Sequence, residues 1–277
     1  MSVLPHSVHD RAELGRLLRC DPALHAYELG DLDDFFWPHT TWYRHGDAVA
    51  LVYHGAGLPI LLALGRPDRA DALAELVEGM VFLLPQRFHA HVTDGVEGVL
   101  GKHFRVEPGG WHHKMALTDP GRLAGFTDAG QVLTEADISD LIQLYASAYQ
   151  ENVFDPRLIR TGQYIGLRRD GRLVAAAGVH IWSPAQRVAT LGNVATHPDL
   201  RGQGLATAAV ATVCRRLLPT VDVIALNVKA DNASAIALYT RLGFSRVAGY
   251  HELDAFPPSA FPVTESGQAQ PPPRSAR

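Results

Sequence analysis

The chain has 277 residues, of which 47% are hydrophobic and 19% charged, a composition typical of one large or two small globular domains. Its net charge of -4 argues against a nucleic-acid-binding protein, which is more commonly basic. Two distant cysteines, Cys20 and Cys214, exclude a disulfide framework, so a reducing, cytoplasmic location is expected. No signal peptide is expected at the N-terminus, and no run of about 18 apolar residues predicts a membrane span.

In the N-terminal half, residues 1–120, helices alternate with strands. The hairpin over residues 42–54 turns at Gly46-Asp47, because these residue types suit a tight turn. Helices are expected over residues 10–20, 69–80 and 95–104, and further strands over residues 59–65, 87–92 and 110–117.

Two histidines in the strand over residues 87–92, His89 and His91, alternate and therefore share one face. Two such ligands can hold a metal, but no Cys or carboxylate partner stands nearby in the sequence. No metal site is therefore predicted.

An interdomain linker is expected over residues 121–130, where apolar periodicity is lost. The domain over residues 131–255 follows, and a disordered, Pro-rich tail is expected over residues 256–277. Within the domain, Thr134 and Asp137 form a capping-box variant, and Asp170-Gly171 predicts a hairpin turn. Helices are expected over residues 133–149, 205–217 and 232–242, and strands over residues 164–169, 172–182, 187–196, 221–228 and 246–253.

Both halves have the same order of elements, namely a helix, three strands, a helix, a strand, a helix and a strand. This repetition indicates a diverged internal duplication. The predicted fold is α/β, with two tandem domains that each contain a mixed, mostly antiparallel sheet flanked by helices.

The stretch HPDLRGQGLATAAV, residues 197–210, places Gly202 and Gly204 where a strand passes into a helix. The first N–H groups of a helix lack internal partners, and glycine lets an anion approach the backbone, so the stretch predicts phosphate binding. A P-loop is disfavoured because Leu205 and Ala206 follow where Lys and Ser or Thr are needed. A bare turn remains the simpler interpretation.

A dinucleotide-binding motif fits only in part. Asp222 lies at the right distance for a ribose contact but precedes its strand. A third pattern matches better, since Arg201 to Ala206 resembles the Arg/Gln-x-x-Gly-x-Gly/Ala motif of the GNAT superfamily of acyl-CoA N-acyltransferases. NVKADNASAIALYTRLGF is similar to that family's second signature, and the resemblance covers about residues 131–253.

The resemblance implies acetyl-CoA, or another short acyl-CoA, as co-substrate and a primary amine of a small molecule or peptide as acceptor. The pantetheine arm would pair with the strand before the motif, and the pyrophosphate would contact the motif's amides. Tyr239, two helical turns after Asn232, would protonate the departing thiolate. The implied cofactor-binding residues are Asn193, Val194, Ala195, Thr196, Arg201, Gly202, Gln203, Gly204, Leu205, Ala206 and Asn232.

Two departures qualify this reading. The strand over residues 187–196 has no Asp or Glu, where many family members have a carboxylate that acts as the general base. A water chain or His180 is an alternative base. A non-catalytic acyl-CoA-binding module is the alternative function. The N-terminal half has Ala70 and Asp71 where glycines would be needed, and Asp71 would repel a pyrophosphate. That half is expected to have lost cofactor binding and to pack against the active half or shape its acceptor pocket.

Overall fold

The computed structural model describes residues 4–55, 57–149 and 154–258. Residues 259–277, most of the predicted tail, lie outside the described residues. The N-terminal half contains β1 His6–Ser7, α1 Arg11–Leu18, α2 Ala26–Gly30, β2 Thr40–His45, β3 Ala48–Tyr53, β4 Ile60–Ala63, α3 Ala70–Met80, β5 Phe88–Val92, α4 Val96–His103 and β6 Arg105–Leu117. The C-terminal half contains β7 Gln131–Val132, α5 Ile138–Ala148, β8 Ile165–Arg169, β9 Arg172–Ser183, β10 Val188–Thr196, α6 Leu205–Leu217, β11 Val223–Lys229, α7 Ala233–Arg241 and β12 Phe244–Phe256.

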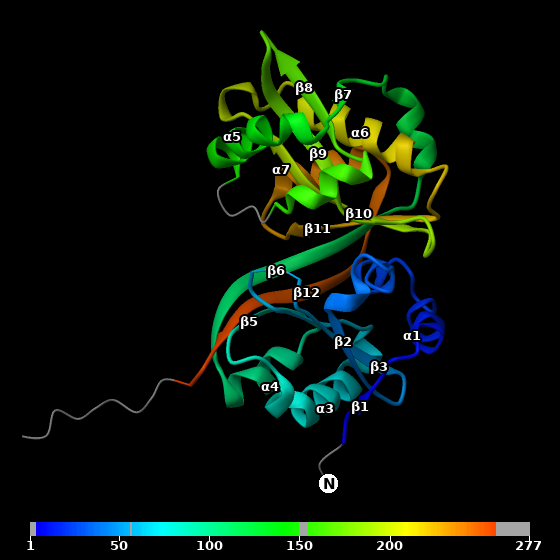
Figure 1. Cartoon of the computed structure of the whole chain (residues 1–277), viewed down its shortest axis with the longest axis vertical. Coiled ribbons are helices and arrows are strands. Elements are labelled where there is room, and N and C mark those ends of the chain that lie inside the picture. The colour runs from blue at the N-terminus through cyan, green and yellow to red at the C-terminus, as the bar shows by residue number, and fades with distance from the viewer. Residues whose placement is uncertain (1–3, 56, 150–153, 259–277) are drawn as a thin grey trace, which may run out of the picture.

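All these strands form one continuous sheet, in the order β1-β2-β3-β4-β5-β12-β6-β11-β10-β9-β8-β7. The expectation of a separate sheet in each half is therefore wrong. The last strand of each half has been exchanged, since β12 lies between β5 and β6, and β6 lies between β12 and β11 (Figure 1). These two antiparallel strands pair from Phe244 with Leu117 to Phe256 with Arg105. Periodicity predicts that each segment is a strand but carries no information about its neighbour.

Local signals in the sequence explain where several elements begin and end. Asp170 and Gly171 both have positive φ, 49° and 79°, as the tight turn between β8 and β9 requires. The predicted capping box of Thr134 and Asp137 is confirmed. Gly243 ends α7 with φ 99°, and a Cβ there would lie 2.1 Å from the carbonyl oxygen of Asp119.

The hydrophobic core crosses the boundary between the halves. One cluster lies beneath α3 and α4 in the N-terminal half. The larger cluster joins leucines of α1 and α2 to the C-terminal β9, β10 and α6. Helix α2 approaches β9 so closely that a Cβ on Gly30 would lie 2.0 Å from Ile181. The beginning of the N-terminal half therefore covers one face of the C-terminal half's sheet.

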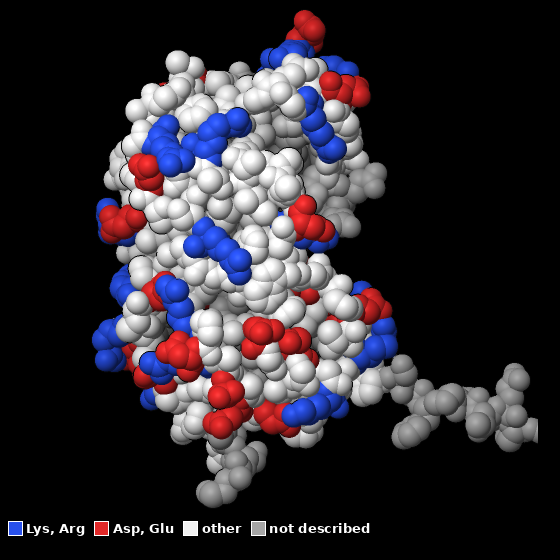
Figure 2. All heavy atoms as spheres, turned by 180° about the vertical axis from the view of Figure 1, so that it is seen from behind, with Lys and Arg blue, Asp and Glu red and all other residues white. Residues whose placement is uncertain are grey.

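The two halves also differ in surface charge. On the face opposite that of Figure 1, Asp and Glu side chains gather on the lower, N-terminal half (Figure 2). An anionic ligand is therefore attracted less to that half of this face. No described helix combines the length and the apolar character that crossing a membrane requires.

Candidate functional site

The glycine-rich stretch forms an open turn at the beginning of α6. The 3-10 helix η7, Pro198–Leu200, is followed by four residues before α6 begins at Leu205. Gly202 and Gly204 have φ of 77° and 76°, a conformation that favours glycine. A Cβ at either position would meet nothing within 4 Å, so the backbone there is accessible from outside. No side chain caps α6, which leaves its first N–H groups directed at this open side.

Arginine side chains surround the turn. Arg169 of β8 donates to the Gln203 side chain at 2.7 Å, and Arg241 of α7 donates to the Thr207 hydroxyl at 2.9 Å. Arg201 is directed at α5, where it donates to the Ala148 carbonyl at 3.1 Å. The sequence motif did not indicate Arg169 or Arg241, because they come from other elements. Together with the helix dipole they make the turn a favourable place for phosphate groups.

Strand β10 separates from β11 immediately before the turn. The two strands pair in parallel from Val188 with Val223 to Leu191 with Leu226, and the pairing stops there. Asn193 then adopts φ 55°, a left-handed conformation in the middle of a strand, where the register with β9 shifts. The edge of β10 over residues 193–196 is consequently unpaired on the β11 side among the described residues.

Two tyrosine side chains hold the bulge at Asn193 in place. The Asn193 amide donates to the Tyr164 hydroxyl at 2.8 Å, and the Tyr145 hydroxyl donates to the Asn193 carbonyl at 3.1 Å. Asn193 is 2% exposed, so these bonds are shielded from water. The strained residue is therefore fixed in position, as residues that shape a site often are.

Helix α7 carries the two residues of the second signature. The Asn232 side chain accepts from the Ala235 N–H at 3.1 Å and so caps the helix. Tyr239 is 8% exposed and contacts Phe244 edge to face at 5.8 Å. Burial, followed by the nearby Tyr149 and Cys214, raises the pKa of Tyr239, so its hydroxyl stays protonated at neutral pH.

Polar side chains from the N-terminal half reach the same region. Tyr27 of α2 lies 6.4 Å from the His180 ring between centroids, and Lys114 of β6 places Nζ 4.9 Å from the Tyr27 ring centroid. Burial lowers the pKa of His180 to about 4, so the imidazole is neutral. No carboxylate occupies β10, in agreement with its sequence.

Lys114 lies among buried acids of α2 and its C-terminal end. It is 1% exposed, and Glu28 and Asp31 are 3% and 5% exposed. Burial lowers the pKa of Lys114 and raises the pKa of Asp31. Burial also acts to raise the pKa of Glu28, but Lys114 and His25 outweigh it, so the pKa of Glu28 is lowered. Sequence reasoning missed this group; the one available signal was a lysine within the apolar end of the strand HHKMAL.

Comparison with known proteins agrees with this geometry. The model of the Acetyltransferase (GNAT) family matches residues 131–244. The C-terminal half therefore matches the GNAT acetyltransferase model over most of its length. A putative GNAT-family acetyltransferase of Novosphingobium aromaticivorans is 27% identical over 76% of this chain and 89% of its own, with a TM-score of 0.56. No curated protein matches the chain.

Other solved structures show that the two-half fold recurs. A Drosophila protein has a TM-score of 0.69 at 16% identity, covering 92% of this chain and 99% of its own. A GCN5-related N-acetyltransferase from Sphaerobacter thermophilus has a TM-score of 0.56 at 14% identity, covering 92% and 98%. At these identities the likeness concerns the fold. The GNAT family implies an acyl-CoA co-substrate and an amine acceptor.

Proposed function

We propose that the C-terminal half transfers an acetyl group from acetyl-CoA to a primary amine. The observation that carries the proposal is the open, uncapped glycine turn of α6 beside the unpaired edge of β10. An extended chain ending in phosphates fits this combination, because a strand edge offers backbone pairing and a helix N-terminus offers anion binding.

In this proposal the pantetheine arm lies along residues 193–196, and the pyrophosphate contacts the amides from Arg201 to Ala206. Asn232 lies at the beginning of α7, on the same helix as Tyr239, and would contact CoA while it caps the helix. Arg169 and Arg241 add positive charge next to the turn. Every implied cofactor-binding residue thus lies on β10, on the turn and beginning of α6, or at the start of α7.

The reaction forms one C–N bond and breaks one C–S bond. The neutral amine attacks the thioester carbonyl, and backbone N–H groups at the free edge of β10 stabilise the oxyanion. The sulfur leaves as a thiolate, to which the protonated Tyr239 hydroxyl donates a hydrogen bond. Tyr239 passes its proton to the thiolate, and the proton that the amine loses returns through solvent to restore the Tyr239 hydroxyl, so no net proton is gained or lost. Holding both reactants in one orientation supplies a large share of the rate.

The acceptor is proposed to bind between the sheet and α2. The buried polar atoms Lys114 Nζ and Glu28 Oε2 have no hydrogen-bond partner among the described residues. Buried groups of this kind normally have partners, so they are candidates to contact a polar acceptor. The N-terminal half would then shape the acceptor site without binding cofactor itself.

The experiment is an amine-dependent thiol assay. The full chain is incubated with acetyl-CoA and a panel of small amines, N-terminal peptides and lysine peptides, and free CoA is measured beside the mass of each acceptor. We expect thiol release that depends on one class of amine, with that amine gaining an acetyl group. Tight acetyl-CoA binding without amine-dependent release would instead support the acyl-CoA-binding module, which the absence of a carboxylate on β10 favours.

A further inference from the structure

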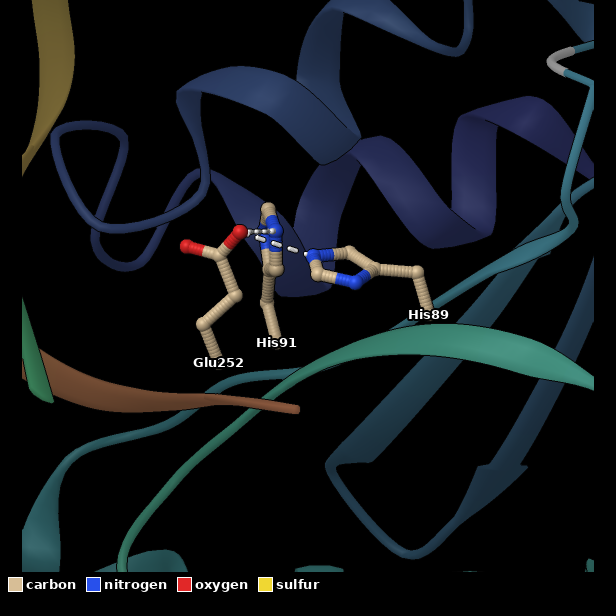
Figure 3. A group of neighbouring side chains, drawn as sticks. All are labelled: His89, His91 and Glu252. Atoms are coloured by element: carbon tan, nitrogen blue, oxygen red, sulfur yellow. Dashed lines mark hydrogen bonds and ion pairs between the residues drawn. The ribbon is translucent and has the colours of Figure 1, made fainter. Parts of the chain in front are cut away.

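Three side chains converge on one face of the sheet where β5 meets β12. His89 and His91 project from the same face of β5, and Glu252 of β12 pairs directly with His91. Glu252 Oε1 lies 2.9 Å from His89 Nε2 and 3.9 Å from His91 Nε2. One ligand atom from each residue lies within 4.8 Å of the other two (Figure 3).

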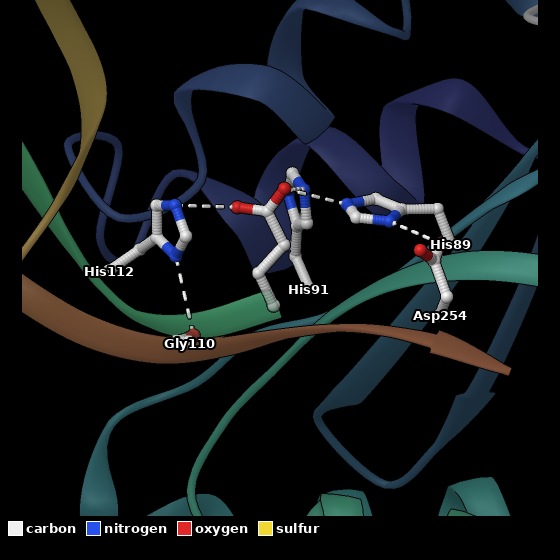
Figure 4. A network of polar contacts seen from close by, with 6 residues as sticks. His89, His91, Gly110, His112 and Asp254 are labelled. Atoms are coloured by element: carbon white, nitrogen blue, oxygen red, sulfur yellow. Dashed lines mark hydrogen bonds and ion pairs between the residues drawn. The ribbon is translucent and has the colours of Figure 1, made fainter. Parts of the chain in front are cut away.

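Asp254 and His112 make further contacts that orient these side chains. Asp254 Oδ1 lies 2.9 Å from His89 Nδ1, on the side of the ring away from Glu252. His112 Nε2 lies 2.8 Å from the second Glu252 oxygen, and His112 Nδ1 faces the Gly110 carbonyl at 3.3 Å (Figure 4). A carboxylate on the outer imidazole nitrogen is the usual outer partner of a metal-binding histidine.

Two carboxylates face one imidazole in this group, so a positive charge is needed there, supplied either by a second proton on His89 or by a metal ion. His89 lies between two carboxylates, which accept only; a neutral imidazole has one N–H to donate, and without a metal ion a protonated imidazole donates to both. In the neutral form with Nδ1–H donating to Asp254, the Nε2 lone pair is free to bind a metal ion that the Glu252 oxygen also binds. His91 also directs Nε2 at that oxygen, at a distance too long for a hydrogen bond. A metal ion between the nitrogens and the oxygen satisfies all three.

We propose that His89 Nε2, His91 Nε2 and Glu252 Oε1 bind one divalent transition-metal ion, of which zinc is the representative. Two imidazoles and one carboxylate suit zinc chemically, and three protein ligands leave a fourth tetrahedral position for water or a substrate group. The ligand side chains are 17–26% exposed, so the ion can enter from solvent. The proposal does not depend on acyl transfer.

Such an ion would join the two halves of the chain. β5 belongs to the N-terminal half and β12 to the C-terminal half. The three ligands therefore come together only when β12 is paired with β5. Sequence reasoning found no carboxylate for His89 and His91 because the partner lies more than 160 residues later along the chain. A ligand that binds only the folded chain raises its melting temperature.

A second cluster offers a matched control. Asp94, Glu97 and His251 also bring three potential ligand atoms together. It has one imidazole instead of two, and Asp94 is 78% exposed, so its carboxylate is well hydrated. His251→Gln tests this cluster with the same substitution that His91→Gln introduces into the proposed site.

The experiment uses the tag-free full chain, purified in the presence of a chelator and then dialysed. Zn²⁺ is titrated by calorimetry, Co²⁺ is used as a spectroscopic probe, and melting is followed with and without Zn²⁺. We expect one Zn²⁺ per chain, a visible Co²⁺ spectrum typical of tetrahedral coordination, and a higher melting temperature with Zn²⁺. His91→Gln should weaken Zn²⁺ binding by at least about 100-fold, since loss of an outer partner alone costs 10- to 100-fold.

His91→Gln is informative because His91 makes no hydrogen bond among the described residues; it does pack against the rings of His89 and Tyr250, so the melting temperature of the metal-free variant is the baseline for its response to Zn²⁺. Glu252→Gln is the second variant and should also lose Zn²⁺ binding. Unchanged Zn²⁺ affinity in both variants, loss of binding in His251→Gln instead, or no binding to the wild type would each overturn the proposal.

Discussion

The two halves enter corresponding helices differently. In the N-terminal half, the 3-10 helix η2, Pro67–Arg69, passes directly into α3 at Ala70. In the C-terminal half, η7 is followed by the four-residue glycine turn before α6. The turn that opens the helix N-terminus is therefore absent from the N-terminal half, and Asp71 stands in the first turn of α3. In our proposal, the same framework binds an anion only where the chain leaves the helix end uncovered.

A similar difference separates α7 from α4. Asn232 caps α7 through its side chain, whereas Gly95, which precedes α4, offers none. Seven residues after each cap stand Tyr239 and Lys102, and Lys102 is exposed beside Glu78. The N-terminal half has instead contributed β6 and the α1–α2 segment to the other half. In our interpretation, the two halves arose by duplication, and the N-terminal half was retained because it supports the fold and forms part of the acceptor site.

The largest effect is expected from Gly204→Glu. This change places a carboxylate and a side chain with unfavourable φ at the open turn, where phosphate would bind, so acetyl-CoA binding should be lost. Calorimetry with acetyl-CoA measures it. Ala70→Glu makes the matched change at the start of α3 and should leave the affinity unchanged. Equal loss in both variants would contradict the assignment of the cofactor site to one half.

Lys114→Met tests the buried charges that the N-terminal half contributes. Removing the ammonium leaves Glu28 buried without the positive charge that does most to lower its pKa, so the free energy of unfolding should fall by about 3 kcal/mol. Denaturant unfolding measures this change. Lys102→Met, at an exposed position of the N-terminal half, should cost less than about 1 kcal/mol. Adding Glu28→Gln to Lys114→Met should restore most of the lost free energy of unfolding. If the double variant is no more stable than Lys114→Met, the two charges are not coupled.

Tyr239→Phe should lower kcat by roughly 10- to 1000-fold and leave the affinity for acetyl-CoA unchanged, because the proton-donating hydroxyl is lost while the ring still packs on Phe244. Steady-state kinetics on the identified amine give the result. Tyr43→Phe, in β2 of the N-terminal half, is the control and should have wild-type kcat. A Tyr239→Phe rate within twofold of wild type would make Tyr239 a packing residue.

Asn232→Ala should have the smallest effect. Loss of the cap should reduce the free energy of unfolding by about 1 kcal/mol, and the KM for acetyl-CoA should rise. Asn232→Asp keeps a capping oxygen but adds negative charge, so it should preserve stability and still raise this KM. If the KM is unchanged in both variants, Asn232 caps the helix and makes no contact with CoA.

Several features were determined by the sequence alone, because they depend on residues close together in the chain. Gly202 and Gly204 predicted the turn before the helix, Asp170-Gly171 predicted the hairpin, and the two signatures predicted the match of the C-terminal half to the GNAT acetyltransferase model. These signals are local since backbone conformation and capping are decided by a few neighbouring residues. The roles of the implied site residues remain predictions.

Only the tertiary structure decided the rest. Strand alternation gives a face but no neighbour, so the exchange of β6 and β12 and the single sheet were not predictable. For the same reason the sequence did not indicate that His89 and Glu252 are neighbours. The pairing of β5 with β12 brings His89 Nε2 within 2.9 Å of Glu252 Oε1. Lys114 likewise acquires its buried acids only when α2 folds over the other half's sheet. Contacts between distant segments depend on which strands and helices pack together. The arrangement that forms is the one with the lowest free energy for the core as a whole.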